Sequence, residues 1–237
     1  MAQFVADARG LPTRRGWSWI AEGWKLFKRR PVVWIVMMLI LAVIFIVLAL
    51  IPVVGALASF VLTPVFVAGI AMGCRALDEG RELELGHLFA GFRTRSGVLV
   101  TVGLLYLAAC FAIALIAGAV AGPTLVSMPT NDPAAIAQAA RGMLLPVLIA
   151  AALFIPVLMA VWFAPPLVVF HDQGAVPAIK LSFAACLKNV LPFLWYGVIL
   201  LALGFIASIP AFLGWIVLAP VMFTSFYASY RDIFLRR

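Results

Sequence analysis

The sequence predicts an all-α integral membrane protein, and composition and charge patterning carry this prediction. Of its 237 residues, 66% are hydrophobic and 11% are charged, and the mean hydropathy is +1.17. A globular chain of this size could not bury so much apolar surface. The runs Pro31–Cys74 and Asn189–Tyr230 contain no charged residue. Each is long enough for two membrane-spanning helices, because about 20 apolar residues cross a hydrocarbon core about 30 Å thick.

Each long run is expected to form a hairpin of two helices. The dipeptides Ile51-Pro52 and Ile209-Pro210 lie near the middle of the two runs, where a turn outside the hydrocarbon core leaves no backbone group unsatisfied in lipid. Ser96–Asn131 and Gly142–Phe170 supply one further span each. The predicted spans are six, at roughly 32–51, 53–74, 97–121, 143–168, 191–209 and 212–230.

The distribution of basic residues predicts the orientation. With six spans, 16 of the 17 Lys and Arg residues fall on the side of the two termini, and only Arg141 falls on the other side. Basic residues concentrate in cytoplasmic loops, so both termini are predicted to be cytoplasmic. The net charge of +8 then belongs to these loops, and we expect no nucleic-acid partner.

Neither a cleaved leader nor a cysteine site is expected. Thirty residues precede the first apolar run, which is longer than the core of a signal peptide, and a second span follows it at once. Cys74, Cys110 and Cys186 are odd in number and widely spaced. This spacing argues against a disulfide framework and against a zinc site.

A weak internal repeat divides the chain. Pro31-x-x-Trp34 opens the first span and Pro192-x-x-Trp195 opens the fifth, while Pro64 and Pro220 occupy matching places in the spans that close the two hairpins. Ala164-Pro165-Pro166 is the candidate third copy. We therefore expect a flexible cytoplasmic N-terminus, 1–13, and one transmembrane domain, 14–237, built from three parallel repeats at about 14–80, 85–174 and 175–237.

Each predicted repeat begins with an amphipathic stretch, called here an interfacial segment. The apolar residues of the first segment recur at helical spacing in Trp17, Ile20, Trp24 and Phe27. The other two segments show the same pattern in Leu85, Leu88, Phe89 and Phe92, and in Ile179, Phe183, Cys186 and Val190.

Such helices lie at the headgroup level of a membrane. They serve either as simple anchors or as docking surfaces for anionic lipid or a protein partner. The residues expected at this interface are Trp17, Trp24, Lys25, Phe27, Lys28, Arg29, Arg30, Phe89, Phe92, Lys180 and Lys188.

Three stretches of sequence carry a resemblance to known proteins. RGWSWIAEGWKLFKRRP, CRALDEG and AIKLSFAACLKN stand at the start, after the second span and before the fifth. With this layout the chain resembles a family of uncharacterised proteobacterial six-span inner-membrane proteins. More distantly, its Ala-Ile-Lys-x-Ser and Lys-Asn pieces are similar to the membrane domain of some glycerophosphodiester phosphodiesterases. The resemblance implies a multi-pass protein of the bacterial inner membrane and transfers no catalytic residue.

The titratable residues do not indicate catalysis. The six predicted spans contain none of the nine acidic residues, and an intramembrane charge is the usual mark of an ion or proton pathway. Asp78 and Glu79 are expected either to cap the segment that follows or to pair with Arg75 and Arg81. His87 and His171, with Asp172, give only a weak signal for a metal site because they lack local ligand spacing. The sequence therefore predicts no enzyme, no metal and no cofactor.

Prolines mark expected interruptions of the helices, because each lacks a backbone donor. Such interruptions either shape helix packing, together with Gly69 and Gly73, or line a cavity. The expected positions are Pro52, Pro64, Pro156, Pro165, Pro166, Pro210 and Pro220.

From these observations we expect a non-enzymatic inner-membrane scaffold, assembly or accessory protein that organises lipids. The alternative is an uncoupled carrier or flippase-like transporter of lipid or another hydrophobic molecule, with a groove between the interrupted helices. The expected partners are membrane lipids, anionic ones among them, and a protein partner or a second copy of the chain.

Overall fold

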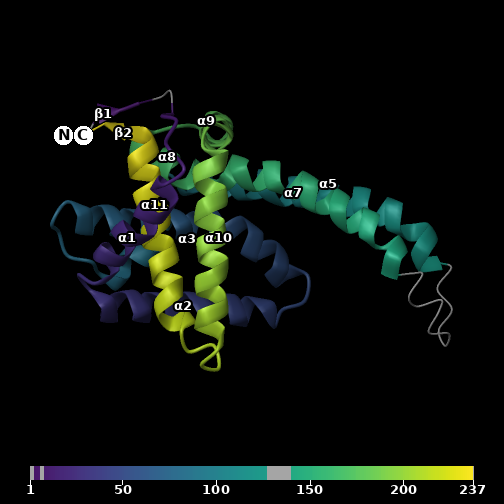
Figure 1. Cartoon of the computed structure of the whole chain (residues 1–237), viewed down its shortest axis with the longest axis horizontal. Coiled ribbons are helices and arrows are strands. Elements are labelled where there is room, and N and C mark those ends of the chain that lie inside the picture. The colour runs from purple at the N-terminus through teal and green to yellow at the C-terminus, as the bar shows by residue number, and fades with distance from the viewer. Residues whose placement is uncertain (1–2, 6–7, 127–139, 237) are drawn as a thin grey trace.

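The computed structural model describes residues 3–5, 8–126 and 140–236, and these are almost entirely helical (Figure 1). Five of the described helices are long and apolar enough to cross a membrane. The sixth predicted span corresponds to α11 (Trp215–Phe234), which is not among the five. Its C-terminal half is more polar, since it carries Thr224, Ser225, Ser229 and the charged pair Arg231 and Asp232.

The first hairpin consists of α2 (Pro31–Ala49) and α3 (Val54–Asp78). Pro31 occupies the first turn of α2, where its fixed φ suits a helix and its missing N–H is not needed. Gly55 allows the turn to close, because a Cβ there would lie 1.7 Å from the backbone oxygen of Leu48. The expected turn at Pro52 is therefore present.

The second hairpin is longer and ends in a broken helix. It consists of α5 (Ser96–Val126) and α7 (Leu144–Trp162), and α8 (Ala164–His171) continues after a break at Phe163. Most of the predicted outer loop lies outside the described residues. The third hairpin consists of α10 (Val190–Ser208) and α11.

Pro165 and Pro166 stand in the first turn of α8, at the predicted break. Pro52 and Pro210 lie in the turns of the first and third hairpins. The prediction of breaks at the other prolines is corrected, because α3, α7 and α11 continue as helices through them. Loss of one helical hydrogen bond is tolerated in an otherwise continuous helix when neighbouring helices pack around it. These three prolines are Pro64, Pro156 and Pro220.

Each interfacial segment is short and precedes a hairpin, as predicted. They are α1 (Arg15–Phe27), the 3-10 helix η1 (Leu85–Phe89) with α4 (Ala90–Arg93), and α9 (Ala175–Lys188). Each packs against a hairpin other than its own. α1 contacts α10 and α11, η1 contacts α3 and α2, and α9 contacts α7 and α8. The second and third segments thus dock on the hairpin that precedes them in the chain, and the first segment docks on the third hairpin.

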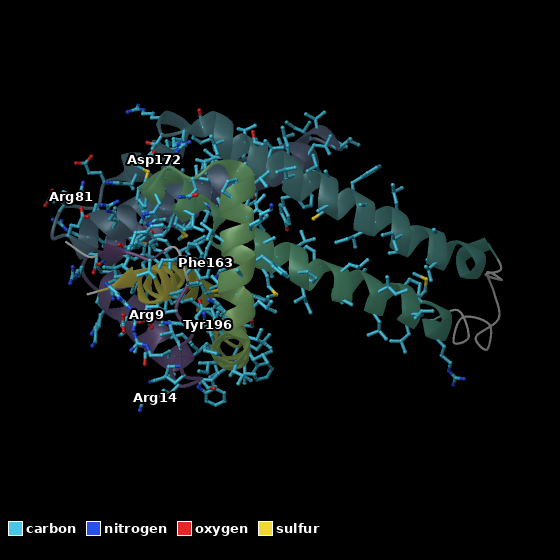
Figure 2. The ribbon with its side chains drawn as sticks, turned by 90° about the horizontal axis from the view of Figure 1, so that it is seen from above. Arg9, Arg14, Arg81, Phe163, Asp172 and Tyr196 are labelled. Carbon is cyan, nitrogen blue, oxygen red and sulfur yellow. The ribbon has the colours of Figure 1, made fainter. Side chains whose placement is uncertain are left out.

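The interfacial segments, α8 and the C-terminal half of α11 form one end of the molecule, called here the base. The hairpins diverge from the base, and the long α5/α7 pair extends away from the α10/α11 pair (Figure 1). Arg9, Arg14, Arg81 and Asp172 lie toward the base, away from the tip of the α5/α7 hairpin (Figure 2).

The chain ends meet at the base. Strand β1 (Gln3–Phe4) pairs antiparallel with β2 (Leu235–Arg236). The Asn189 side chain donates to the backbone oxygen of Arg9 and accepts from the backbone N–H of Leu11, both at 2.9 Å. The described parts of the N-terminal segment 1–13 thus make contacts with the base that the sequence did not indicate.

Candidate functional site: the first interfacial helix and the third hairpin

Helix α1 presents different apolar faces to the protein and to its surroundings. Trp19 is fully buried against Phe193 and Tyr196 of α10, with ring centroids 5.1 and 5.9 Å away. Trp17 and Trp24 are 57% and 42% exposed. The predicted apolar arc therefore divides into two parts. Ile20 and Phe27 are buried with Trp19, while Trp17 and Trp24 face outward, where lipid would be.

Small residues bring α1 close to the third hairpin. A Cβ on Gly23 would lie 2.5 Å from the backbone nitrogen of Ser225, and the Thr224 hydroxyl donates to the Gly23 oxygen at 2.9 Å. A Cβ on Gly16 would lie 2.6 Å from the backbone oxygen of Pro192. Only glycine permits backbones this close, so the two glycines fix where α1 docks.

Small residues also hold the other two segments against their hairpins. A Cβ on Gly91 of α4 would lie 2.1 Å from the Val65 oxygen in α3. Ser182 of α9 accepts from the Phe163 N–H at 2.8 Å and donates to the Met159 oxygen at 2.7 Å. Ser182 thus satisfies backbone groups at the break between α7 and α8, where the helical ladder is interrupted.

A cluster of charged side chains, called here the ionic cluster, joins three helices at the base. It consists of Arg15 and Glu22 on α1, Asp78 at the end of α3, and Arg231 and Asp232 on α11. Arg231 binds Asp78 and also Glu22, the latter at 2.6 Å. Burial lowers the pKa of Arg231, but its hydrogen bonds to these two carboxylates outweigh burial and raise it.

Asp232 completes the cluster from the other side. It accepts from Arg15 Nε at 2.6 Å and from Trp19 Nε1 at 3.0 Å. The hydrogen bond to Asp232 raises the pKa of Arg15. All five charged groups are mostly sheltered from solvent, and each has an opposite partner. The cluster therefore holds α1, α3 and α11 together and offers no free acid or base for chemistry.

An apolar groove of about 610 Å³ runs between α1 and the α10/α11 hairpin. Trp17, Ile20 and Trp24 form its α1 side, and Leu203, Pro210 and Val217 are among the residues that form its other side. Lys25 and Lys28 are the charged residues of the lining. The sequence predicted these aromatic and basic residues at an interface, but it did not predict the groove.

The four basic residues predicted near the end of α1 have different contacts in the structure. Arg29 donates to the Leu77 oxygen at the end of α3, and Arg30 binds Glu82. No hydrogen bond or ion pair joins the side chain of Lys25 or of Lys28 to another residue within the described ranges. The two arginines therefore brace the first hairpin, and the two lysines remain available to a ligand.

The remaining predicted interface residues lie on the other two segments. Phe89 and Phe92 pack against Phe66 of α3, with ring centroids 6.2 and 5.3 Å away, and remain partly exposed. Lys180 and Lys188 are exposed on α9. These residues do not reach the groove beside α1.

A second cavity, of about 280 Å³, lies where the three hairpins meet. Pro64, Trp162, Pro165 and Phe226 are among its lining residues, and Tyr196 contributes a hydroxyl that bonds Ser225 at 2.7 Å. Tyr196 and Phe163 lie in the middle of the molecule (Figure 2). Two of the predicted proline positions therefore line a cavity.

Gly69 and Gly73 serve a packing role. Their partner is not a neighbouring span but η1 and the residues just before it. Added Cβ atoms would lie 2.5 Å from the His87 backbone oxygen and 2.8 Å from the Leu83 side chain. The pair therefore admits η1 and the residues just before it against α3.

Within the described residues, no three of the acids and histidines that the sequence singled out come together as a possible metal site. Glu79 pairs with Arg75 and with Arg81, as one interpretation predicted, while Asp78 binds Arg231 instead.

The remaining members of this set also have partners of their own. Glu84 caps η1 together with His87. His171 stacks on Phe4, with ring centroids 3.7 Å apart, and bonds Tyr230. Asp172 binds Arg95 at 3.0 Å.

Comparison with known proteins found a relative that covers most of the chain. It is a protein of Burkholderia thailandensis named as a probable inner membrane protein, 29% identical over 249 aligned positions that cover 94% of this chain and 92% of the relative. No family model matches the chain, and no solved structure matches it. Together with the apolar helices, this relative supports a multi-pass inner-membrane protein. The resemblance to the membrane domain of glycerophosphodiester phosphodiesterases stays a prediction.

Proposed function

We propose that this protein is a non-enzymatic scaffold or accessory protein of the inner membrane that organises lipids or a partner complex. The observation that carries the proposal is the base, where each interfacial segment docks on a hairpin other than its own. Three hairpins with exposed apolar faces diverge from this base (Figure 1). Exposed apolar faces of this extent are covered by lipid or by a partner.

We further propose that all three hairpins insert from the cytoplasmic side, with six spans and both termini in the cytoplasm. Residues 215–230 of α11 carry no charge, so this stretch is compatible with a membrane environment although it is more polar than the other helices. The sixteen-to-one distribution of basic residues supports this orientation. The three similar docking arrangements support the division into three parallel repeats.

A second candidate function is an uncoupled carrier for a lipid or another hydrophobic molecule. The cavity at the meeting point of the hairpins favours it, because Pro165, at the break between α7 and α8, lines that cavity. Transporter sites often lie near interrupted helices at the middle of the membrane.

The proposal is tested by complementation of a gene deletion. The readouts are growth and lipid composition, and the variants are His87→Ala, His171→Ala, Asp172→Ala, Glu82→Ala and Glu84→Ala, each produced at the wild-type level in the membrane. A scaffold distributes its binding over many contacts, so each variant is expected to complement. A variant as defective as the deletion would instead indicate catalysis or ion coupling.

Purification in a mild detergent separates the scaffold from the carrier. A scaffold is expected to retain a protein partner in fixed stoichiometry. A carrier is expected to bind a hydrophobic ligand whose affinity falls when the central cavity is filled by Val67→Phe.

A further inference from the structure

We propose that the groove between α1 and the α10/α11 hairpin binds one anionic glycerophospholipid. Its acyl chains would lie along the apolar walls, and its phosphate would bind Lys25 and Lys28. This inference deepens the lipid-organising part of the proposed function and rests on that function only for the membrane location.

The walls of the groove suit a hydrocarbon chain. Ile20 on α1, Leu203 and Ile206 on α10, and Val217 and Val221 on α11 are all aliphatic. The volume of about 610 Å³ is more than twice that of the central cavity, at about 280 Å³. Each CH₂ group that leaves water for such a wall improves affinity about fourfold.

The charges of the groove determine which headgroup it takes. Lys25 lies in the last turn of α1 and Lys28, three residues on, is its C-cap with helical φ and ψ, so the two lie on the same side of the helix. None of the described residues that line the groove is acidic. Glu22, one turn before Lys25, is occupied by Arg15 and Arg231. The groove therefore offers two positive charges to a phosphate, with no carboxylate in its lining to neutralise them.

The exposed tryptophans point to a lipid as the occupant. Trp17 and Trp24 both line the groove, and both are well exposed. Indole rings favour the level of the headgroups, where one part of the ring is wet and the other is apolar. Aliphatic walls, paired lysines and flanking indoles in one groove match the three zones of a phospholipid.

The test is a lipid titration of the full-length protein in mild detergent, followed by native mass spectrometry. Phosphatidylglycerol is compared with phosphatidylcholine that carries the same acyl chains. We expect one phosphatidylglycerol per chain, bound more tightly than phosphatidylcholine. One basic residue contributes about fivefold in affinity for an anionic headgroup, so Lys25→Gln with Lys28→Gln should weaken phosphatidylglycerol binding about 25-fold. Phosphatidylcholine binding should weaken much less, because its choline ammonium offsets the charge of its phosphate.

Two matched controls separate the groove from general surface charge and bulk. Lys180→Gln removes an exposed lysine of α9 that does not line the groove, and it should leave binding unchanged. Ala21→Phe places a ring in the groove and should weaken both lipids, whereas Ala184→Phe on the exposed side of α9 should not.

Equal phosphatidylglycerol affinity in the double lysine variant and in Lys180→Gln would overturn the proposal. The lysines are exposed, so their replacement should leave the melting temperature unchanged, and folding is checked in this way. A double variant that loses lipid selectivity as predicted but still complements the deletion would support the site and limit its role in the scaffold. If one of the histidine or acid variants were as defective as the deletion while phosphatidylglycerol still bound the groove, the proposed function alone would fail.

Discussion

The α10/α11 and α5/α7 hairpins differ in what holds their helices. The two helices of the second hairpin pack against each other, α5 also packs along α3, and α9 docks on α7 at the break before α8. The third hairpin receives α1, which contacts both α10 and α11 through Gly16 and Gly23 and through the ionic cluster. The second hairpin is thus an apolar arm, whereas the third is part of the base.

This difference indicates that the docking of interfacial segments determines which parts of the spans are buried inside the protein. Where α1 docks, α11 carries hydroxyl groups and charges that find partners, among them Thr224 with Gly23 and Asp232 with Trp19. Along the arm, many large apolar side chains, such as Phe111 and Leu148, are exposed instead. The more polar composition of α11 is therefore explained by its contact with α1.

The largest expected effect concerns the orientation of the arm relative to the base. We expect a cysteine placed at Asn131, in the predicted outer loop outside the described residues, to react with an impermeant thiol reagent only from the periplasmic side. A cysteine at Gly10, near the base, should react only from the cytoplasmic side. The background carries Cys110→Ala, and labelling is read in intact cells and in inverted vesicles. Reaction of the Asn131 cysteine only from the cytoplasm would refute the topology.

The next effect tests the close approach of α1. Gly23→Leu places a side chain against the Ser225 backbone, and overpacking of this kind costs about 3 kcal/mol or more. Gly118→Leu on the arm is the matched control, since a Cβ there meets nothing within 4 Å, and it should leave stability unchanged or slightly raised. Thermal unfolding in detergent measures both variants. Equal melting temperatures for the two would mean that α1 does not dock as described.

A smaller effect tests the ionic cluster. Arg231→Met leaves Asp78 without its partner and removes one of the two partners of Glu22 in a sheltered site, which should cost about 2 kcal/mol. Arg81→Met removes an exposed pair with Glu79 and should cost less than about 1 kcal/mol. Chemical denaturation of the two variants measures the difference in their free energies of unfolding. An equal cost would show that the cluster is no tighter than a surface pair.

The sequence alone predicted the hairpins, because the features that indicate them involve residues close together in the chain. Uncharged runs and the Ile-Pro turns at Pro52 and Pro210 depend only on neighbouring residues, and the structure contains both turns. Amphipathic periodicity likewise located the three interfacial segments. The division of the apolar arc of α1 into a buried part, Ile20 and Phe27, and an exposed part, Trp17 and Trp24, depends on small residues that face another hairpin. The predicted apolar face did not take these small residues into account.

The ionic cluster could not be predicted for the same reason. Arg231 and Asp78 are 153 positions apart, and each has nearer charged residues in the sequence. Neighbouring residues indicated pairing of Asp78 with Arg75 or Arg81, but the packing of α11 against α3 brings Arg231 to Asp78 instead. A signal was available in the run Tyr230-Arg231-Asp232, since charges that directly follow an apolar helix need partners at the base.

The smallest expected effect comes from an ion pair within one helix end. Arg75 and Glu79 are four residues apart at the end of α3 and are both partly exposed. Hydrogen bonds from Arg75 and Arg81 lower the pKa of Glu79 below its ordinary value of 4.5. A lowered carboxyl pKa stabilises the fold above pH 4.5, and the contribution disappears as the pH falls through the lowered value.

Glu79→Gln should therefore cost less than about 1 kcal/mol at pH 7, and its melting temperature should converge with that of the wild-type chain in acid. Glu82→Gln is the comparison variant. It removes an exposed ion pair with Arg30 that joins two segments of the chain. Melting curves of both variants between pH 7 and pH 3 give the measurement. If the Glu79 variant lost as much stability at pH 7 as Arg231→Met, pairing within a helix end would contribute as much as pairing between helices. The distinction between the base and the arm would then need another physical basis.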